Sequence, residues 1–156
     1  MQIRTFEELE IWKTARRLTQ EVYALSKAPQ FSKDYGLRDQ MRRASVSIMS
    51  NVAEGFERGG NQEFTQYLYV AKASCGEVRS QLYVALDQEY VDQKTRDELL
   101  AVTQHLSVMI SISSIISNEA ACAARSTAIR PNRVLPGPIE RLEPLERLEH
   151  LERVSQ

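Results

Sequence analysis

The sequence predicts an all-α protein: an antiparallel, up-down-up-down four-helix bundle followed by a disordered or irregular C-terminal tail. Apolar residues recur at intervals of three and four residues in separate segments of the 156-residue chain. Pro29 and the pair Gly59-Gly60 interrupt this pattern between segments. Near the C-terminus, Pro131, Pro136 and Pro138 interrupt any regular element.

The first predicted helix runs from Thr5 to about Lys27. Thr5 followed by Glu8 has the spacing of a capping box, in which a hydroxyl and a carboxylate bond to free amide groups at a helix start. Pro29 ends the helix, because proline has no amide hydrogen and restricts the residue before it. The predicted core-facing residues are Ile11, Ala15, Leu18, Val22 and Leu25.

The segment from Phe31 to Gly36 is predicted to be a loop, and a second helix follows it as far as Gly55. At about 100° per residue, this helix has two apolar stripes on different sides. The first stripe contains Leu37, Met41, Ala44, Ile48 and Val52. The second stripe contains Arg42, Val46, Met49 and Ala53. We expect the first stripe to pack in the core and the second to contact a partner.

The third predicted helix follows Gly59-Gly60 and has the most regular pattern. Its spacing of three and four residues continues for about six turns, which a strand cannot accommodate. Cys75 falls within this pattern and is therefore predicted to be a small core residue. The apolar positions are Phe64, Leu68, Ala71, Cys75, Val78, Leu82 and Leu86.

Asp92 or Thr95 can cap a fourth helix. Its predicted core stripe contains Leu99, Val102, Leu106, Met109 and Ile110. Val108, Ile112 and Ile115 fall on a different side. A helix that is apolar on two sides needs a second buried contact, which self-association provides. The sequence therefore predicts a homo-oligomer, with an interface formed by Val46, Met49, Val108, Ile112 and Ile115.

The chain divides into a four-helix bundle domain, residues 1–118, and a low-complexity tail, residues 119–156. From Ile139 the tail repeats every six residues, as Ile-Glu-Arg-Leu-Glu-Pro, Leu-Glu-Arg-Leu-Glu-His and Leu-Glu-Arg-Val-Ser-Gln. Apolar residues at every third position drift around a helix, and Pro144 interrupts the repeat. We expect a disordered or frayed tail, the alternative being a docking helix.

Composition is that of an ordinary soluble protein, with 42% hydrophobic and 26% charged residues. The formal net charge of −1 excludes a uniformly basic nucleic-acid-binding protein, so electrostatic binding must come from local patches. Cys75 and Cys122 lie far apart without a CxxC pattern, which indicates neither a disulfide framework nor a zinc site. No signal region or apolar run of transmembrane length is found, which predicts a cytoplasmic protein without membrane contact.

No catalytic, cofactor-binding or metal-binding residue set is predicted. A di-iron bundle needs Glu-x-x-His ligands on two helices, but the only histidines are His105 and His150, and His150 lies in the tail. The sequence contains neither a serine elbow nor a phosphate-binding loop. We therefore expect a protein that is not an enzyme and that carries no cofactor.

A second pattern on the third helix indicates a nucleic-acid interface. Tyr69, Lys72, Gly76, Arg79 and Tyr83 recur at intervals of three and four residues, roughly 80 to 100° from the core stripe. Lysine and arginine neutralise phosphates with release of counterions, and tyrosine rings stack on unpaired bases. The alternative is that the tyrosines fill a subunit interface and the cations pair with nearby acids.

Arginines of the second helix extend the candidate site. Arg38 and Arg42 lie one turn apart and can point the same way. Arg42 is predicted to form an interface ion pair or a phosphate contact, because a guanidinium makes two directed hydrogen bonds. Arg43 is rotated away and is predicted to pair with Asp39 or Glu54. The complete nucleic-acid candidate set is Arg38, Arg42, Lys72, Arg79, Tyr69 and Tyr83.

Between Phe6 and Ser117 the chain contains several ordered strings. They are Phe6 through Trp12 with Ala15; Tyr35-Gly36-Leu37; Gln40-Met41-Arg42-Arg43-Ala44; Val46-Ser47-Ile48; Ser50-Asn51-Val52-Ala53-Glu54-Gly55; and Glu63-Phe64 with Gln81-Leu82. Together they resemble the four-helix-bundle proteins related to the 23S ribosomal RNA intervening-sequence proteins. The part from Arg-Arg-Ala through Ala-Glu-Gly is the most specific, because such an ordered string does not readily arise by chance.

This resemblance implies an antiparallel four-helix monomer. The family includes the accessory variability determinant of diversity-generating retroelements, for which it implies a homopentameric barrel with a basic channel that binds nucleic acid and a reverse transcriptase. By this resemblance, the expected partners are further copies of the chain in a pentamer, RNA or single-stranded DNA, and a reverse transcriptase or another protein.

Two functions are therefore expected from the sequence. The first is a non-enzymatic homo-oligomeric scaffold that binds RNA or single-stranded nucleic acid through a local basic and aromatic face. The alternative is a protein-interaction adaptor without nucleic-acid binding, which presents the stripe of Arg42, Val46, Met49 and Ala53 to a specific protein.

Overall fold

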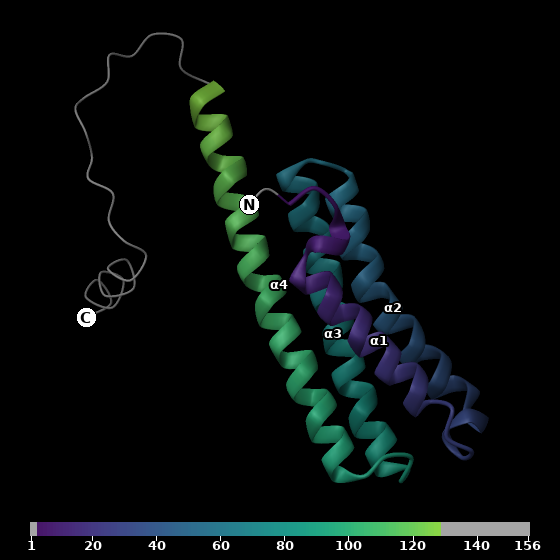
Figure 1. Cartoon of the computed structure of the whole chain (residues 1–156). Helices are drawn as coiled ribbons and strands as arrows, with labels where there is room; N and C mark the ends of the chain where they lie inside the picture. The colour runs from purple at the N-terminus through teal and green to yellow at the C-terminus, as the bar shows by residue number, and fades with distance from the viewer. Residues whose placement is uncertain (1–2, 129–156) are drawn as a thin grey trace, which may run out of the picture.

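The structure is a computed structural model that describes residues 3–128, with the side chains of residues 3–123. The helices α1, α2, α3 and α4 lie side by side, and α4 extends beyond the others at one end (Figure 1). The described residues contain no strand, and the all-α prediction is confirmed. The elements are the 3-10 turn η1 (Phe6–Glu8), α1 (Glu10–Leu25), the 3-10 turn η2 (Phe31–Lys33), α2 (Tyr35–Glu57), α3 (Asn61–Asp87) and α4 (Gln93–Ala128).

Successive helices run in opposite directions. For each pair of consecutive helices, contacts that lie further along the first helix involve earlier residues of the second. The contacts that establish this are Thr19–Ser45 and Ser26–Arg42 between α1 and α2, Ser47–Ser74 and Glu54–Tyr67 between α2 and α3, and Asn61–Ser117 and Tyr83–Arg96 between α3 and α4. The fold is the predicted antiparallel up-down-up-down bundle.

The predicted core stripes form one hydrophobic core. Most residues of the stripes are buried, and the others are partly buried and pack against this core, as at Leu25, Phe64 and Val102. Cys75 is fully buried, as predicted. Since burying one aliphatic side chain contributes about 1.5–3 kcal/mol, this core is the main source of stability. Fully buried members include Leu18, Met41, Ile48, Leu68, Leu82, Leu106 and Ile110.

The predicted capping box at Thr5 is wrong. Thr5 precedes the short turn η1 and its hydroxyl makes no capping hydrogen bond, while α1 begins only at Glu10. The Glu8 carboxylate instead accepts a hydrogen bond from the Arg4 amide at 3.0 Å. The spacing of a capping box was present, but the chain between Thr5 and Glu8 turns too tightly to begin the long helix.

The segment predicted as a loop contributes to the core. Phe31 begins η2 and is fully buried, with its ring stacked on that of Tyr90 at 5.0 Å between centroids. The Tyr90 hydroxyl donates to Asp34 Oδ2 at 3.3 Å, and Asp34 Oδ1 caps α2 by accepting from the Leu37 amide at 3.0 Å. Phe31 and Tyr90 thus join the α1–α2 connection to the α3–α4 connection and close this end of the bundle.

A glycine permits close approach of α2 and α3 at the other end. A Cβ atom added at Gly55 would lie 2.7 Å from the Tyr67 Cβ and 3.0 Å from the Phe64 ring. Real Cβ atoms do not come that close to other carbon atoms, so any larger residue at this position must push the helices apart. Gly55 therefore sets the spacing between α2 and α3.

Helix α4 begins at a cap and continues beyond the rest of the bundle. The Thr95 amide donates to Asp92 Oδ1 at 2.7 Å, which selects Asp92 as the cap. The helix continues past residue 118, where the domain is expected to end, as far as Ala128; the repeats from Ile139 onward lie outside the described residues.

By length and composition alone, α4 also resembles a membrane-crossing helix. Its most apolar window of 18 residues has a mean hydropathy of 1.7, and 33% of that window is buried. One helix of this kind is weak evidence for a membrane span, because the core helix of a soluble protein can pass the same test of length and composition.

Candidate functional site

Tyr69, Lys72, Arg79 and Tyr83 lie on one face of α3. Tyr69 and Tyr83 are 55% and 51% exposed, Lys72 is exposed and Arg79 is partly exposed. A Cβ atom added at Gly76, in the middle of this face, would meet no atom within 4 Å, so the face is uncovered there. The structure brings these four predicted residues together as a row in which two cations lie between two rings, and we call this row the α3 face.

The cations of the α3 face have no acidic partner. Neither Lys72 nor Arg79 forms an ion pair with another described residue. The Nε atom of Arg79 is buried without a hydrogen-bond partner, which is uncommon for a polar atom in a folded protein. The Arg96 guanidinium of α4 lies over the Tyr83 ring, 5.2 Å from the ring centre. Acidic neighbours therefore do not neutralise this row.

Arg38 makes its contacts within the subunit. Its Nε donates to Asp39 Oδ1 at 2.8 Å and its Nη1 donates to the Ser32 carbonyl at 3.0 Å. The guanidinium also lies 4.6 Å from the centre of the Tyr35 ring. These contacts join α2 to the turn before it, so Arg38 stabilises the local fold.

Arg42 joins α2 to the end of α1. Its Nε donates to Ser26 Oγ at 2.7 Å and its Nη2 donates to the Ser26 carbonyl at 3.2 Å, while the guanidinium covers the Tyr23 ring at 4.9 Å. Ser26 follows the last residue of α1, where unpaired carbonyl groups favour a cation. All these partners are uncharged, so none of them neutralises the positive charge of Arg42.

The six nucleic-acid candidates therefore do not form one surface. Arg38 and Arg42 lie on the side of the bundle where α1 meets α2, whereas the other four lie on α3. The predicted pairing of Arg43 with Asp39 or Glu54 is wrong, because Asp39 pairs with Arg38 and Glu54 pairs with Arg58. Arg43 is exposed and forms no ion pair with a described residue.

The candidate interface residues differ in exposure. Val108, Ile112 and Ile115 project from the outer side of α4 together with Ile116, and these four are between 53% and 62% exposed. Ile116 was missed by the sequence analysis, although the adjacent pair Ile115-Ile116 was a signal for it. Val46 is 37% exposed, and Met49 packs against the core.

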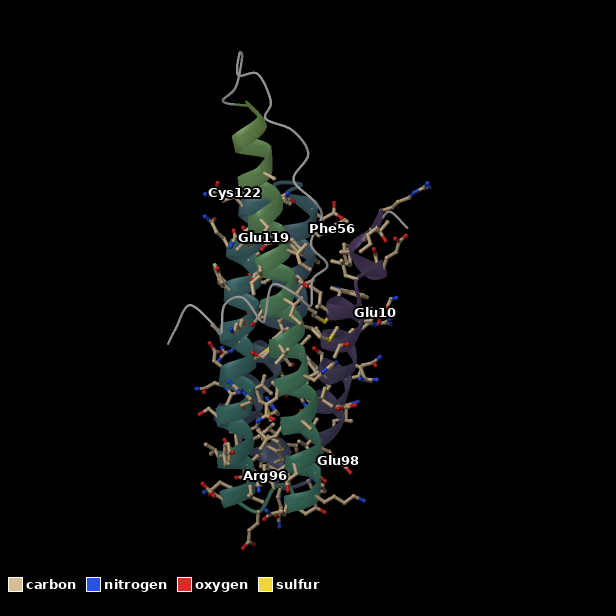
Figure 2. The ribbon with its side chains drawn as sticks, turned by 90° about the vertical axis from the view of Figure 1, so that its left-hand side faces the viewer. Glu10, Phe56, Arg96, Glu98, Glu119 and Cys122 are labelled. Atoms are coloured by element: carbon tan, nitrogen blue, oxygen red, sulfur yellow. The ribbon has the colours of Figure 1, made fainter. Side chains whose placement is uncertain are left out.

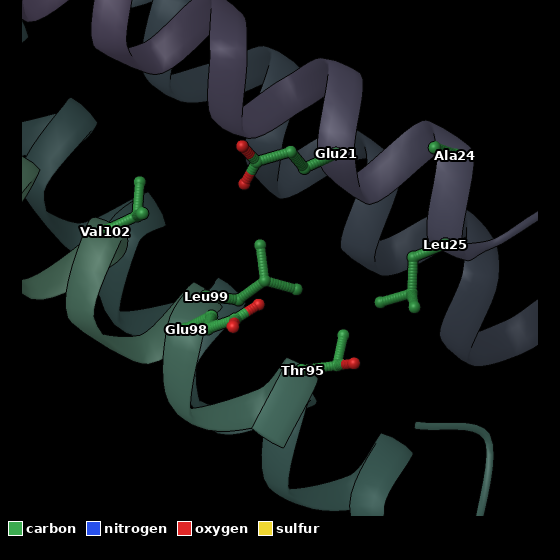
Figure 3. Close-up of a pocket in the computed structure, with 7 residues that line it drawn as sticks. All are labelled: Glu21, Ala24, Leu25, Thr95, Glu98, Leu99 and Val102. Atoms are coloured by element: carbon green, nitrogen blue, oxygen red, sulfur yellow. The ribbon is translucent and has the colours of Figure 1, made fainter. Parts of the chain in front are cut away.

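A slot of about 320 Å³ lies between α1 and α4. Figure 3 shows the Glu21 side chain directed from α1 toward α4, with Glu98 and Leu99 on the opposite wall. The remaining lining is Ala24, Leu25, Thr95 and Val102, and it contains no histidine, cysteine or cation. The slot places the Glu21 carboxylate on the side of α1 that faces α4.

The described residues also include possible metal ligands and thiol groups. In the part of the chain that the structure describes, no three His, Cys, Asp or Glu residues are placed to hold a metal ion. Cys122 is exposed on the projecting part of α4 (Figure 2), whereas Cys75 lies in the core. Burial raises the pKa of the Cys75 thiol to about 12, and the nearby Arg79 charge opposes this only partly.

We expect iodoacetamide at neutral pH to modify one cysteine per native chain and two after unfolding. Only a thiolate reacts, and the raised pKa keeps Cys75 protonated in the folded protein. Mass spectrometry of the modified protein measures the number of labels. As a control, the Cys122→Ser variant should remain unlabelled until it unfolds, and rapid native labelling of that variant would contradict the assignment of Cys75 to the core.

Comparison with known proteins identifies the family. A solved structure of a protein of unknown function from the S23 ribosomal protein family of Bacteroides thetaiotaomicron has the same fold, with a TM-score of 0.61 and 18% sequence identity over 66% of this chain and 97% of that chain. Among curated proteins, no significant match is found. The model of the family described as 23S rRNA-intervening sequence protein matches residues 7–112. This chain therefore belongs to the 23S rRNA-intervening sequence protein family.

Proposed function

We propose that this protein is a non-enzymatic, self-associating helical scaffold that binds RNA or single-stranded nucleic acid. The observation that carries the proposal is the α3 face, where Lys72 and Arg79 lie without acidic partners beside the exposed rings of Tyr69 and Tyr83. Lysine and arginine side chains bind phosphates, and exposed tyrosine rings stack on unpaired bases.

Self-association is proposed from the outer side of α4. Four large aliphatic side chains project there, Val108, Ile112, Ile115 and Ile116, and an exposed apolar stripe of this kind is typical of an interaction surface. Assembly would place several binding faces along one nucleic-acid strand, and each additional contact would then form at high effective concentration. A pentamer is the stoichiometry implied by the family resemblance.

The adaptor function has less support. Of its proposed stripe, Arg42 contacts Ser26 and Tyr23 within the subunit, and Met49 packs against the core. Val46 is the exposed large aliphatic residue of that stripe. A stripe that is largely used within the subunit offers little apolar area to a protein partner.

Binding to a fluorescently labelled single-stranded RNA should weaken steeply as salt increases. The logarithm of the binding constant falls with the logarithm of the salt concentration by about 0.7 for each phosphate contact. Fluorescence anisotropy titrations at several salt concentrations measure this slope. The Tyr69→Ala variant should bind more weakly at every salt concentration with the slope unchanged, because base stacking involves no counterion release.

Two outcomes would contradict the proposed function. One is the absence of a complex between the full chain and the RNA at low salt. The other is an affinity that does not change with salt, because phosphate contacts by lysine and arginine always release counterions.

A further inference from the structure

Positive charge is concentrated in one segment of the chain. Residues 11–53, which cover most of α1 and α2, contain eight lysines and arginines but three acidic residues, a net charge of +5. Residues 54–119 contain five lysines and arginines and ten acidic residues, a net charge of −5. The net charge of the whole chain, near zero, therefore conceals two segments of opposite sign.

The three acidic residues of this positive segment have other contacts. Asp34 caps α2 and accepts from Tyr90, and Asp39 pairs with Arg38. The Glu21 side chain enters the slot between α1 and α4 (Figure 3). None of the three forms an ion pair with the exposed Arg16, Lys27 or Arg43, and these cations have no ion-pair partner elsewhere among residues 3–123.

Contacts between α1 and α2 bring the unpaired cations to one surface. Tyr23, Arg42 and Arg43 line a shallow hollow of about 540 Å³ between the two helices, together with Asp39, whose carboxylate pairs with Arg38. Lys27 directly follows Ser26, to which Arg42 is bonded. Arg16 precedes Tyr23 by seven residues and so lies on the same side of α1. We call Arg16, Tyr23, Lys27, Arg42 and Arg43 the α1–α2 basic surface.

We propose that the α1–α2 basic surface is the main phosphate-binding site of this protein and that it holds the sugar–phosphate backbone of RNA or single-stranded DNA. This inference rests on the proposed nucleic-acid function and assigns it to a surface. The α3 face then contributes mainly base stacking, because its two cations lie in the segment, residues 54–119, where acidic residues are in excess.

The spacing of the cations favours a chain of phosphates over a single phosphate ion. Arg16 and Ser26 are separated by ten residues, or about 15 Å along α1. Cations spread over that length cannot converge on one anion, but they can contact successive phosphates of one strand. The exposed Tyr23 ring between them provides a stacking surface for a base.

A matched pair of double variants tests this assignment. Lys27→Glu with Arg43→Glu and Lys72→Glu with Arg79→Glu each replace one lysine and one arginine, so both change the net charge by the same amount. With about 0.7 counterions released per contact, losing two contacts should weaken RNA binding about 25-fold at about 0.1 M salt. The second pair should weaken binding less than about fivefold, because α3 makes fewer phosphate contacts. Anisotropy titrations with the same labelled RNA measure both.

The outcomes separate this inference from the proposed function. If the α3 pair loses as much affinity as the α1–α2 pair, or more, the nucleic-acid function stands and the surface assignment is overturned. If the unaltered chain does not bind RNA at low salt, both fail. Because Arg79 is partly buried, thermal unfolding by circular dichroism checks each variant, and the corresponding Lys→Gln and Arg→Gln pairs replace any pair that does not fold.

An acidic protein is the competing ligand for a surface of this charge. Labelled poly-glutamate presents carboxylates without phosphates or bases and serves as its probe. We expect poly-glutamate to bind more weakly than RNA of equal charge, because it offers no base to stack on Tyr23. Binding of poly-glutamate that equals or exceeds the binding of RNA would overturn the assignment to nucleic acid.

Discussion

Replacement of Phe31 by alanine is expected to lower the free energy of unfolding by about 3–5 kcal/mol. The ring is fully buried and stacks on Tyr90, so truncation removes its apolar contacts and leaves a cavity at the closed end of the bundle. The rigid connections on either side, held by Asp34, limit how far the structure can collapse into that cavity. Urea unfolding followed by circular dichroism measures the loss.

Tyr69→Ala is the control for this loss. Tyr69 is also aromatic but projects from the α3 face into solvent, and an exposed substitution of this kind changes the free energy of unfolding by less than about 0.5 kcal/mol. A Phe31→Ala variant as stable as Tyr69→Ala would show that the connection does not close the core.

The burial of Phe31 is a feature of the fold that could not be predicted from the sequence. The helical core could be predicted because a helix buries residues at intervals of three and four, as at Leu68, Ala71 and Cys75. A connection has no such period. Phe31 and Val91 are buried because two connections meet at one end of the bundle, which is a consequence of tertiary structure that no local spacing encodes.

The candidate site shows the same limit for charged residues. The α3 face could be predicted because its members lie on one helix, where spacing alone determines which side they share. The contact of Arg42 with Ser26 spans two helices, and no spacing rule relates those two positions. Arg43 was predicted to pair with Asp39 or Glu54. In the folded chain, Asp39 pairs with Arg38 and Glu54 pairs with Arg58.

The uneven distribution of charge is present in the sequence, but it becomes visible only when the net charge is counted separately for the correct segments. The net charge of −1 averages a positive segment, residues 11–53, and a negative segment, residues 54–119. Since α1 and α2 are adjacent in the fold, charges that are close in sequence also lie on one side of the molecule. The separation therefore becomes a physical surface, which a count over the whole chain cannot reveal.

Replacing both Ile112 and Ile115 by glutamate is expected to convert the proposed homo-oligomer to monomers. Both side chains project from α4 into solvent within one subunit, so the fold itself loses no buried contact and its unfolding should change by less than about 0.5 kcal/mol per residue. Within an interface between copies, each glutamate would bury a charge without a partner, and such a penalty exceeds the contribution of the apolar contact that it replaces. Sedimentation velocity measures the change in mass.

A matched variant distinguishes the α4 stripe from exposed apolar residues in general. Val70→Glu with Val84→Glu also places two glutamates at exposed aliphatic positions, but on α3, and should leave the assembly intact. Dissociation by both pairs, or a monomeric unaltered chain, would contradict an α4 interface. RNA binding connects this result to function: the α4 variant retains every cation of the α1–α2 basic surface, so any loss of its affinity relative to the Val70 and Val84 variant measures what several copies on one strand contribute.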